Sequence, residues 1–251
     1  MSAAGGGSAA PAVRVNGLSY AYGVAGYVLH DVSFSVPAGE TVVVTGSSGC
    51  GKTTLCHCLT GLAPKALGGA MTGTVSILGD DIEPLAVPAV SKRIGMVFQD
   101  PDNQLVMTTV EDELAFGPEN LAVEPEEIRR RVDRELGRFG LERFALRSPG
   151  ELSGGEKRLV ALAAVLTLDP PVLILDEPFA HLDERGRDRV RAAVLDLSAS
   201  GRTLLIVEHV LALVDFAGRY LVLERGRLVA DTATPPALPA YAAPPRLEVP
   251  A

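Results

Sequence analysis

The stretch Thr41-Val-Val-Val-Thr-Gly46-Ser-Ser-Gly-Cys-Gly-Lys52-Thr53 is the part of this sequence that best predicts its fold. Its first five residues are all β-branched, which predicts a buried strand that ends at a glycine-rich loop. A helix-forming segment, Thr54-Leu-Cys-His-Cys-Leu-Thr60, follows the loop. This order is typical of a phosphate-binding loop, because glycines let backbone N–H groups approach phosphate oxygens and the helix presents its positive end to them. The stretch therefore predicts an α/β domain that binds a nucleotide.

The loop supplies most of the residues expected to hold the nucleotide. The side chain of Lys52 has the length to reach the β- and γ-phosphates, and the hydroxyl of Thr53 can bind Mg²⁺. We therefore expect ATP to bind together with Mg²⁺. The nucleotide-binding residues expected here are Gly46, Ser47, Ser48, Gly49, Cys50, Gly51, Lys52, Thr53 and Thr54.

Two carboxylates follow a second apolar strand, Val172-Leu-Ile-Leu175. Asp176 and Glu177 come at its carboxyl end, which is where parallel strands of an α/β sheet present functional residues. Asp176 is suited to the Mg²⁺ shell, and Glu177 is suited to polarise the water that attacks the γ-phosphate. A further apolar run at 203–207 predicts another central parallel strand.

A second glycine-rich element, Leu152-Ser-Gly-Gly-Glu156, precedes a helical run at 157–168. Ser153 is a good N-cap, and Gly154 and Gly155 expose backbone N–H groups at the positive end of that helix. The simplest interpretation is a capped helix start without a ligand. Beside a phosphate-binding loop, however, the element predicts a second anion site. A head-to-tail pair of chains would let this site cover the loop of the partner.

Composition and charge narrow the class of protein. The chain has 251 residues and 47% apolar content, which allows one large domain with a buried core. Its net charge of −8 disfavours a general nucleic-acid binder, because such proteins carry a basic surface. No apolar run reaches the roughly 18 residues of a membrane span, and residues 1–11 lack the pattern of a secretory signal. We therefore expect a cytosolic protein with no nucleic-acid partner, whose membrane role comes through other proteins.

The three cysteines, Cys50, Cys56 and Cys58, lie in or just after the loop. Their spacing is not that of a metal site, and small thiols on such a helix usually pack in the core. Cys50 is the expected exception, because a thiol inside a phosphate loop can be open to oxidation.

The chain divides into a body and two tails. Residues 1–12 are low in complexity and are expected to be disordered, and residues 232–251 form a proline-rich tail. The body is expected to span 13–231. Charged, helix-favouring residues after Asp100 predict a helical insert within it, at about 100–158.

Across the expected body, the order of motifs resembles that of ABC ATPases. The order is the phosphate-binding loop, Gln99, Leu152–Glu156, Asp176-Glu177, Leu182-Asp183 and His209. The resemblance implies an α/β fold with a P-loop NTPase (RecA-like) core, an N-terminal antiparallel β subdomain and an inserted helical subdomain.

The resemblance also implies roles for single residues. Gln99 matches a glutamine that contacts Mg²⁺ or water and senses the transmembrane partner, and His209 matches the switch histidine that contacts the γ-phosphate. Tyr22 matches the aromatic residue that stacks on adenine. The implied catalytic residues are Glu177, His209 and Gln99, and the implied Mg²⁺ ligands are Thr53, Gln99 and Asp176. The residues implied to act on the nucleotide of the partner chain are Ser153, Gly154, Gly155, Glu156 and Asp183.

A narrower resemblance lies in two segments, Val97-Phe-Gln-Asp-Pro-Asp-Asn-Gln104 and Ala115-Phe-Gly-Pro-Glu-Asn120. Both are similar to the ATPases of energy-coupling factor (ECF) transporters, which take up vitamins or transition-metal ions. The resemblance implies a peripheral protein on the cytoplasmic face of the cell membrane. Its implied partners are a second ABC ATPase subunit (itself or a paralogue), a transmembrane coupling protein and a substrate-binding membrane subunit. The first segment would lie beside the groove that receives the coupling helices.

Three positions depart from the usual ABC pattern. Glu156 replaces a glutamine, Leu159 replaces an arginine that here stands one place earlier as Arg158, and His181 replaces a small residue. The carboxylate of Glu156 is expected to add negative charge near the nucleotide of the partner and to slow hydrolysis. Three alternative functions stay open: a conventional ABC transporter, a non-transport ABC ATPase acting on DNA or ribosomes, and a regulatory subunit that binds ATP without turnover.

Overall fold

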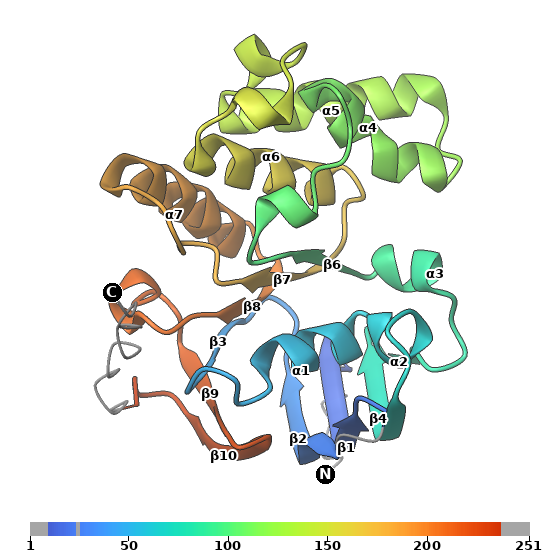
Figure 1. Cartoon of the computed structure of the whole chain (residues 1–251), viewed down its shortest axis with the longest axis vertical. Coiled ribbons are helices and arrows are strands. Elements are labelled where there is room, and N and C mark those ends of the chain that lie inside the picture. Colours follow the sequence, from blue (N-terminus) through green and yellow to red (C-terminus); the bar gives the residue numbers. More distant parts are fainter. Residues whose placement is uncertain (1–9, 24–25, 237–251) are drawn as a thin grey trace, which may run out of the picture.

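A computed structural model describes residues 10–23 and 26–236 of the chain, which form two β-sheets and the helices around them (Figure 1). The strands are β1 (Val13–Ala21), β2 (Tyr27–Val36), β3 (Thr41–Gly46), β4 (Ala70–Ile77), β5 (Asp80–Asp81), β6 (Ile94–Val97), β7 (Val172–Asp176), β8 (Thr203–Val207), β9 (Arg219–Glu224) and β10 (Arg227–Thr232). The α-helices are α1 (Lys52–Leu59), α2 (Leu62–Lys65), α3 (Val87–Ser91), α4 (Val110–Asn120), α5 (Pro125–Phe139), α6 (Gly154–Leu166) and α7 (Glu184–Ala199). Short 3₁₀ helices are η1 (Pro101–Asn103), η2 (Glu142–Phe144), η3 (Pro149–Glu151) and η4 (Leu211–Leu213).

The larger sheet has six strands in the order β10-β9-β3-β8-β7-β6. Strands β9, β3, β8, β7 and β6 run parallel, and β10 runs antiparallel to β9. Every residue of β3, β7 and β8 is buried, as expected for parallel strands that are covered on both faces. The prediction of central strands at 41–45, 172–175 and 203–207 is therefore confirmed.

Two separate apolar cores cover the two faces of this sheet, because successive side chains of a strand point to opposite faces. In β3, Val42 and Val44 belong to one core and Val43 belongs to the other. The first core also contains residues of α1 and of the smaller antiparallel sheet, whose strand order is β2-β1-β4-β5. The second core contains residues of α4, α5, α6 and α7. In Figure 1 these helices lie across the larger sheet from α1 and the smaller sheet. The expected fold class, a P-loop core with an N-terminal antiparallel sheet and inserted helices, is confirmed.

The ends of the packed body differ slightly from the expected boundaries. Ala12, expected in a disordered tail, is 1% exposed, and Thr232, expected in the proline-rich tail, is the last residue of β10. Residues 1–9 and 237–251 of the expected tails lie outside the described residues. Within the described part of the chain, no helix is both long enough and apolar enough to cross a membrane.

Gly95 allows a close contact between β6 and α6. A Cβ atom at this position would lie 2.4 Å from Val165 Cγ1 and 3.0 Å from Pro170 Cγ. Because these neighbours are tightly packed, Gly95→Ala is expected to lower the free energy of unfolding by about 1–3 kcal/mol, as measured by urea denaturation. Gly218→Ala is the matched control, because no neighbouring heavy atom of the described chain lies within 4 Å of a Cβ at Gly218. Equal losses of stability in both variants would contradict this account.

Candidate nucleotide site

Four parallel strands deliver the expected site residues to one edge of the larger sheet. β3 ends at Gly46 of the phosphate-binding loop, and β7 ends at Asp176, directly before Glu177. β8 ends shortly before His209, and β6 ends shortly before Gln99. Because these strands run parallel in one sheet, their carboxyl ends lie at the same edge.

Two glycines shape the phosphate-binding loop. Gly46 has φ 144° and Gly51 has φ 107°, backbone conformations that residues with a Cβ atom disfavour. A Cβ at Gly46 would also lie 2.0 Å from the carbonyl oxygen of Leu223 on β9. Gly51 is the N-cap of α1 and forms no side-chain cap, so the first N–H groups of this helix are left for a ligand in the loop.

Lys52 holds the loop from inside. Its Nζ atom donates to the carbonyl oxygens of Gly46, at 3.1 Å, and of Ser47, at 2.9 Å. Lys52 is buried, whereas Ser47, Ser48 and Gly49 are exposed. The ammonium group thus lies beneath an exposed rim of backbone.

All three cysteines are buried. Cys56 and Cys58 pack in the first core as predicted, and burial raises the pKa of the Cys58 thiol to about 12. Cys50 is 4% exposed, and its N–H donates to the carbonyl oxygen of Ser47 at 3.3 Å. The expectation that the Cys50 thiol is open to oxidation is therefore wrong, because this side chain belongs to the apolar core.

Glu177 is held at both carboxylate oxygens. Gln99 Nε2 donates to Glu177 Oε2 at 2.7 Å, and His209 Nε2 lies 2.7 Å from Glu177 Oε1. The hydrogen bond to His209 lowers the pKa of Glu177, so this carboxyl group is charged at neutral pH. The structure thus brings together the three residues that the resemblance implies to be catalytic.

Asp176 and Thr53 form a second pair at the same edge. Thr53 Oγ1 donates to Asp176 Oδ2 at 3.0 Å, and burial raises the pKa of Asp176. The other oxygen, Asp176 Oδ1, is buried and has no hydrogen-bond partner among the described residues. A buried carboxylate oxygen without a donor is suited to a cation, so this pair fits Mg²⁺. The described residues hold no cluster of three or more His, Cys, Asp or Glu side chains that could bind a metal ion.

Glu208 is a buried residue of this edge that the sequence reasoning missed. Its Oε1 atom accepts the N–H of His209 at 2.7 Å and that of Val210 at 2.9 Å. The side chain is buried, and this burial raises the pKa of the Glu208 carboxyl group. Glu208 therefore fixes the turn that carries His209. The sequence does show an acidic residue directly after an apolar strand. Such a residue can cap a turn or simply face solvent at the end of the strand, so the pattern alone does not predict the contacts of Glu208.

Tyr22 lies beside the first turn of α1. Its hydroxyl is 3.4 Å from Thr54 Oγ1, and its ring packs edge-to-face on Tyr20 with ring centroids 4.8 Å apart. The two contacts fix the aromatic ring next to the phosphate-binding loop.

Ser153 begins α6 with a capping box, which confirms the predicted N-cap. The carboxylate of Glu156 accepts the N–H of Ser153 at 3.0 Å and its hydroxyl at 2.7 Å. Arg143 and Arg189 lie 3.8 and 3.7 Å from the same carboxylate, and hydrogen bonding to Ser153 lowers the pKa of Glu156. The negative charge of Glu156 is therefore offset in part within the chain. The slower hydrolysis expected from Glu156 stays a prediction.

The start of α6 packs against the start of α7, which Asp183 caps. Asp183 Oδ1 accepts the N–H of Gly186 at 2.8 Å, and a Cβ at Gly155 would lie 2.9 Å from Gly186 Cα. No hydrogen bond within the described chain joins residues 153–156 to the phosphate-binding loop. The residues implied to act on a partner's nucleotide are thus grouped with one another and not with the loop of their own chain.

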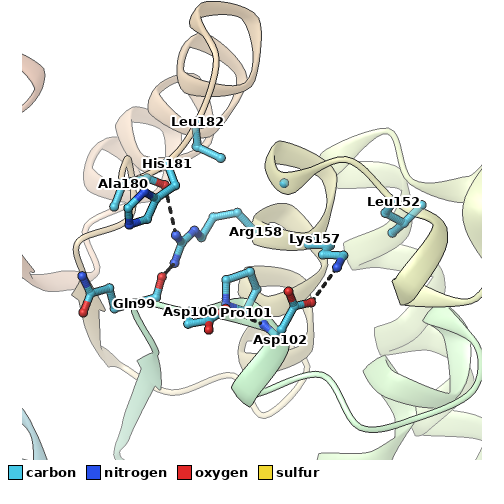
Figure 2. Close-up of a pocket in the computed structure, with 11 residues that line it drawn as sticks. Gln99, Asp100, Pro101, Asp102, Leu152, Lys157, Arg158, Ala180, His181 and Leu182 are labelled. Carbon is cyan, nitrogen blue, oxygen red and sulfur yellow. Dashed lines mark hydrogen bonds and ion pairs between the residues drawn. The ribbon is translucent and has the colours of Figure 1, made fainter. Parts of the chain in front are cut away.

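Arg158 is a further residue whose place the sequence reasoning did not predict. A cavity of about 440 Å³ lies between Gln99, the start of α6 and Leu182, and Arg158 crosses it (Figure 2). Arg158 is buried and donates to backbone carbonyl oxygens on both sides of this cavity.

Leu159, where an arginine is usual, packs in the second apolar core instead. Leu159 is 2% exposed, whereas the guanidinium of Arg158 reaches polar backbone atoms.

Comparison with known proteins agrees with this geometry. The family profile described as "ABC transporter" matches residues 29–180. The chain is 43% identical over 205 residues to the cobalt import ATP-binding protein CbiO of Syntrophus aciditrophicus, covering 81% of this chain and 71% of that protein. It is 38% identical over 220 residues to the energy-coupling factor transporter ATP-binding protein EcfA of Methanosarcina acetivorans, covering 87% of this chain and 78% of the relative. A putative ABC transporter ATP-binding protein of the same organism is 40% identical over 224 residues, and this chain spans 36% of its length.

Two solved structures are similar over most of the chain. The structure of cbiO1 from Clostridium perfringens, part of the ABC transporter complex cbiONQ, has a TM-score of 0.78 and 31% identity, covering 89% of each chain. A dimeric ATP-binding cassette in a post-hydrolysis state, bound to ADP and Pi, has a TM-score of 0.76 and 26% identity, covering 88% of this chain and 98% of the other. The family profile covers more than half of the chain, and the relatives cover most of it. The chain therefore belongs to the ABC transporter family, as one of its ATP-hydrolysing subunits.

Proposed function

We propose that this chain is the motor subunit of an ECF-type importer, in which two ATPase subunits couple ATP binding and hydrolysis to the uptake of a vitamin or a transition-metal ion. One observation carries the catalytic part: both carboxylate oxygens of Glu177 are held, by Gln99 and His209, at the sheet edge that carries the phosphate-binding loop. The similarity to CbiO and EcfA proteins supports the importer class.

Glu177 is the residue that activates water in this proposal. Its charged carboxylate accepts a hydrogen bond from a water molecule and orients that water in line with the γ-phosphate. His209 contacts the γ-phosphate and keeps Glu177 in place. Lys52 and the backbone N–H groups of the loop bind the phosphates, and the ring of Tyr22 packs on the adenine.

Thr53, Asp176 and Gln99 are the residues that would hold Mg²⁺. The buried Oδ1 atom of Asp176, which has no hydrogen-bond partner among the described residues, supports this assignment. When bound, Mg²⁺ neutralises charge on the β- and γ-phosphates. The hydrogen bond between Thr53 and Asp176 keeps both oxygen ligands on the side of the loop that faces the phosphates.

A second ATPase subunit, either a copy of this chain or a paralogue, completes each nucleotide site. Ser153, Gly154, Gly155, Glu156 and Asp183 would then act on the nucleotide of the partner. Their grouping at the start of α6 and α7, together with the likeness to a dimeric cassette bound to ADP and Pi, supports this arrangement. The two subunits would lie on the cytoplasmic face of the membrane as peripheral proteins.

The membrane partners would dock on the helical side of the molecule, which contains the surface around Gln99. A groove of about 650 Å³ lies between α4 and α5. Its charged lining residues are Glu111, Asp112, Glu119, Asp133 and Arg129, and its remaining lining residues are apolar. An acidic groove with an apolar floor suits an amphipathic basic helix. We assign it to a cytoplasmic helix of the transmembrane coupling protein, although the segment at 97–104, which the resemblance places beside such a groove, does not line it.

Co-purification from native membranes tests this function. Tagged wild-type protein is expected to retain one transmembrane coupling protein together with small integral-membrane subunits, identified by mass spectrometry. The double reversal Glu119→Lys/Asp133→Lys is expected to reduce this recovery about tenfold or more and to leave ATP binding unchanged. Neither side chain makes a hydrogen bond or ion pair with other described residues, so the fold should tolerate the change.

The matched control reverses two other exposed glutamates, Glu83→Lys and Glu224→Lys, and should leave the recovery unchanged. Recovery of a symmetric permease pair would instead indicate a conventional ABC transporter. Soluble partners alone would indicate a non-transport ABC ATPase. Equal losses in both double variants would show that net charge, and not the groove, controls the association.

A further inference from the structure

Arg158 contacts the two backbone segments that flank the catalytic carboxylate. Its Nη1 atom donates to the carbonyl oxygen of Phe98, at 2.8 Å, and to that of Gln99. Its Nη2 atom lies 3.4 Å from the carbonyl oxygen of Ala180. Figure 2 shows the guanidinium group spanning the gap between Gln99 and Ala180. One planar fork thus joins the loop that carries Gln99 to the turn that follows Glu177.

The turn after Glu177 needs such a support. Glu177 has φ 46° and His181 has φ 58°, and both are left-handed backbone conformations that cost energy for residues other than glycine. The N–H of Ala180 donates to the carbonyl oxygen of Glu177 at 3.1 Å, which closes the turn. Arg158 contacts this turn at the carbonyl oxygen of Ala180, the residue directly before His181. Strained backbone at a reactive residue persists only where its surroundings hold it.

Arg158 also supports Glu177 from the other side. The backbone carbonyl of Gln99 is bound by Arg158, and the side chain of Gln99 donates to Glu177 Oε2 at 2.7 Å. The neighbouring Lys157 reaches the same loop, because its Nζ atom lies 2.6 Å from Asp102 Oδ1. Two successive residues of α6 therefore hold the segment at 98–102.

Arg158 is buried and its two Nη atoms contact backbone carbonyl oxygens, whereas its Nε atom has no hydrogen-bond partner among the described residues. Arg158 is 3% exposed, and this burial lowers the pKa of its guanidinium, which is nevertheless charged at any physiological pH. The negative charges of Asp100, Asp176 and Glu177 act in the opposite direction and favour its charged form. A buried cation that donates to backbone carbonyls cannot leave them without losing its solvation. Arg158 is therefore fixed in place relative to the start of α6.

We propose that Arg158 is a positioning residue for Glu177, which links the start of α6 to the catalytic carboxylate of the same chain. Ser153 and Gly154 stand about one helical turn before Arg158, and the capping box makes this turn of α6 rigid. A phosphate group bound at the start of α6 thereby sets the position of Gln99 and of the Glu177 turn. This last step rests on the proposed function, because the phosphate belongs to the nucleotide on the partner subunit.

Steady-state kinetics of Arg158→Met and Arg158→Lys test the positioning role. Arg158→Met is expected to lower kcat by about 10- to 100-fold, because small displacements of a catalytic group have effects of this size. The dissociation constant for ATP should change less than about threefold, because Arg158 does not touch the phosphate-binding loop. Arg158→Lys keeps the charge, but the lysine side chain is shorter and lacks the planar fork whose two nitrogens reach the carbonyl oxygens of both segments, so its kcat should also be low.

Arg131→Met is the matched control. Arg131 Nη1 donates to the carbonyl oxygen of Thr167 at 3.0 Å, so it makes the same kind of contact at the opposite end of α6. This variant should show a comparable loss of thermal stability with kcat within about twofold of wild type. Equal losses of kcat in Arg131→Met and Arg158→Met, or full activity of Arg158→Lys, would overturn the proposal.

A double-mutant cycle with Gln99→Ala separates positioning from general destabilisation. Gln99→Ala removes the side chain through which Arg158 supports Glu177 and leaves the contact with Ala180 in place, so Arg158→Met should lower kcat less in this background than in wild type. Effects on kcat that multiply would mean that Arg158 does not act through Gln99, and would overturn the proposal.

Amide hydrogen exchange tests the link to the partner's phosphate. In a Glu177→Gln background, ATP with Mg²⁺ is expected to protect residues 153–156, 98–104 and 177–183. With Arg158→Met added, protection of 153–156 should remain and that of the other two segments should shrink. Unchanged protection of 177–183 would overturn the proposed link. If 153–156 are not protected in either protein, the composite site of the proposed function fails, and the link fails with it, while the kinetic arms still decide whether Arg158 positions Glu177.

Discussion

Replacing Glu177 with glutamine is expected to lower kcat for ATP hydrolysis by about 10²- to 10³-fold and to leave ATP binding unchanged. Glutamine keeps the volume of the side chain and can still accept a hydrogen bond from His209. The amide of Gln99 can rotate to present its oxygen to the new amide, so the geometry of the cluster is kept. The kcat falls because glutamine lacks the negative charge that polarises the attacking water and accepts its proton. Single-turnover hydrolysis and equilibrium binding of ATP measure the two quantities separately.

The same variant should accumulate as a closed dimer. When ATP remains intact, each γ-phosphate stays bound by groups of both subunits, so size-exclusion chromatography with ATP and Mg²⁺ should show a stable pair. Glu224→Gln, an isosteric change of an exposed glutamate at the end of β9, is the control and should turn over like wild type. Normal turnover in Glu177→Gln would remove Glu177 from the role of base. Loss of ATP binding would mean that this side chain shapes the nucleotide pocket instead.

The residues of the catalytic edge could be predicted from the sequence, because the direction of the strands determines which residues lie at that edge. Three runs rich in β-branched and aliphatic residues, at 41–45, 172–175 and 203–207, could only be central strands of a parallel sheet. Parallel strands place their carboxyl ends together, so Glu177 and His209 had to meet near the loop once those strands were recognised. The N-cap at Ser153 was predictable for a similar reason, because a serine followed three residues later by a glutamate is the local pattern of a capping box.

The contacts that support this edge were not predictable, because they use backbone atoms or charges from distant segments. Arg158 bonds to carbonyl oxygens, which every residue carries, so no sequence pattern marks its partners. The charge of Glu156 is offset in part by Arg143 and Arg189, which lie in η2 and in α7. The burial of Cys50 depends on how the loop packs on the first core. These features depend on tertiary packing, which local propensity does not describe.

Ser153→Arg is expected to abolish turnover, by about 10²-fold or more, while the chain still binds ATP at its own phosphate-binding loop. Within the chain, Ser153 bonds to Glu156 and has no hydrogen bond to the described residues of the loop, so the substitution leaves the loop itself intact. The arginine side chain would occupy the space where the proposed partner's γ-phosphate meets the start of α6. The measurement compares kcat with the dissociation constant for ATP in the assembled transporter.

Ser153→Ala is the control that separates this steric effect from the loss of the helix cap. It removes the side chain that accepts the N–H of Glu156, which should cost about 1 kcal/mol of stability and lower kcat only a few-fold. Ser153→Arg loses the same cap, so the two variants should unfold at similar temperatures although their turnover differs by more than tenfold. Equal losses of ATP binding and turnover in Ser153→Arg would indicate that the element serves folding. A kcat for Ser153→Arg close to that of Ser153→Ala would mean that no phosphate approaches the start of α6, and the composite site would have to be abandoned.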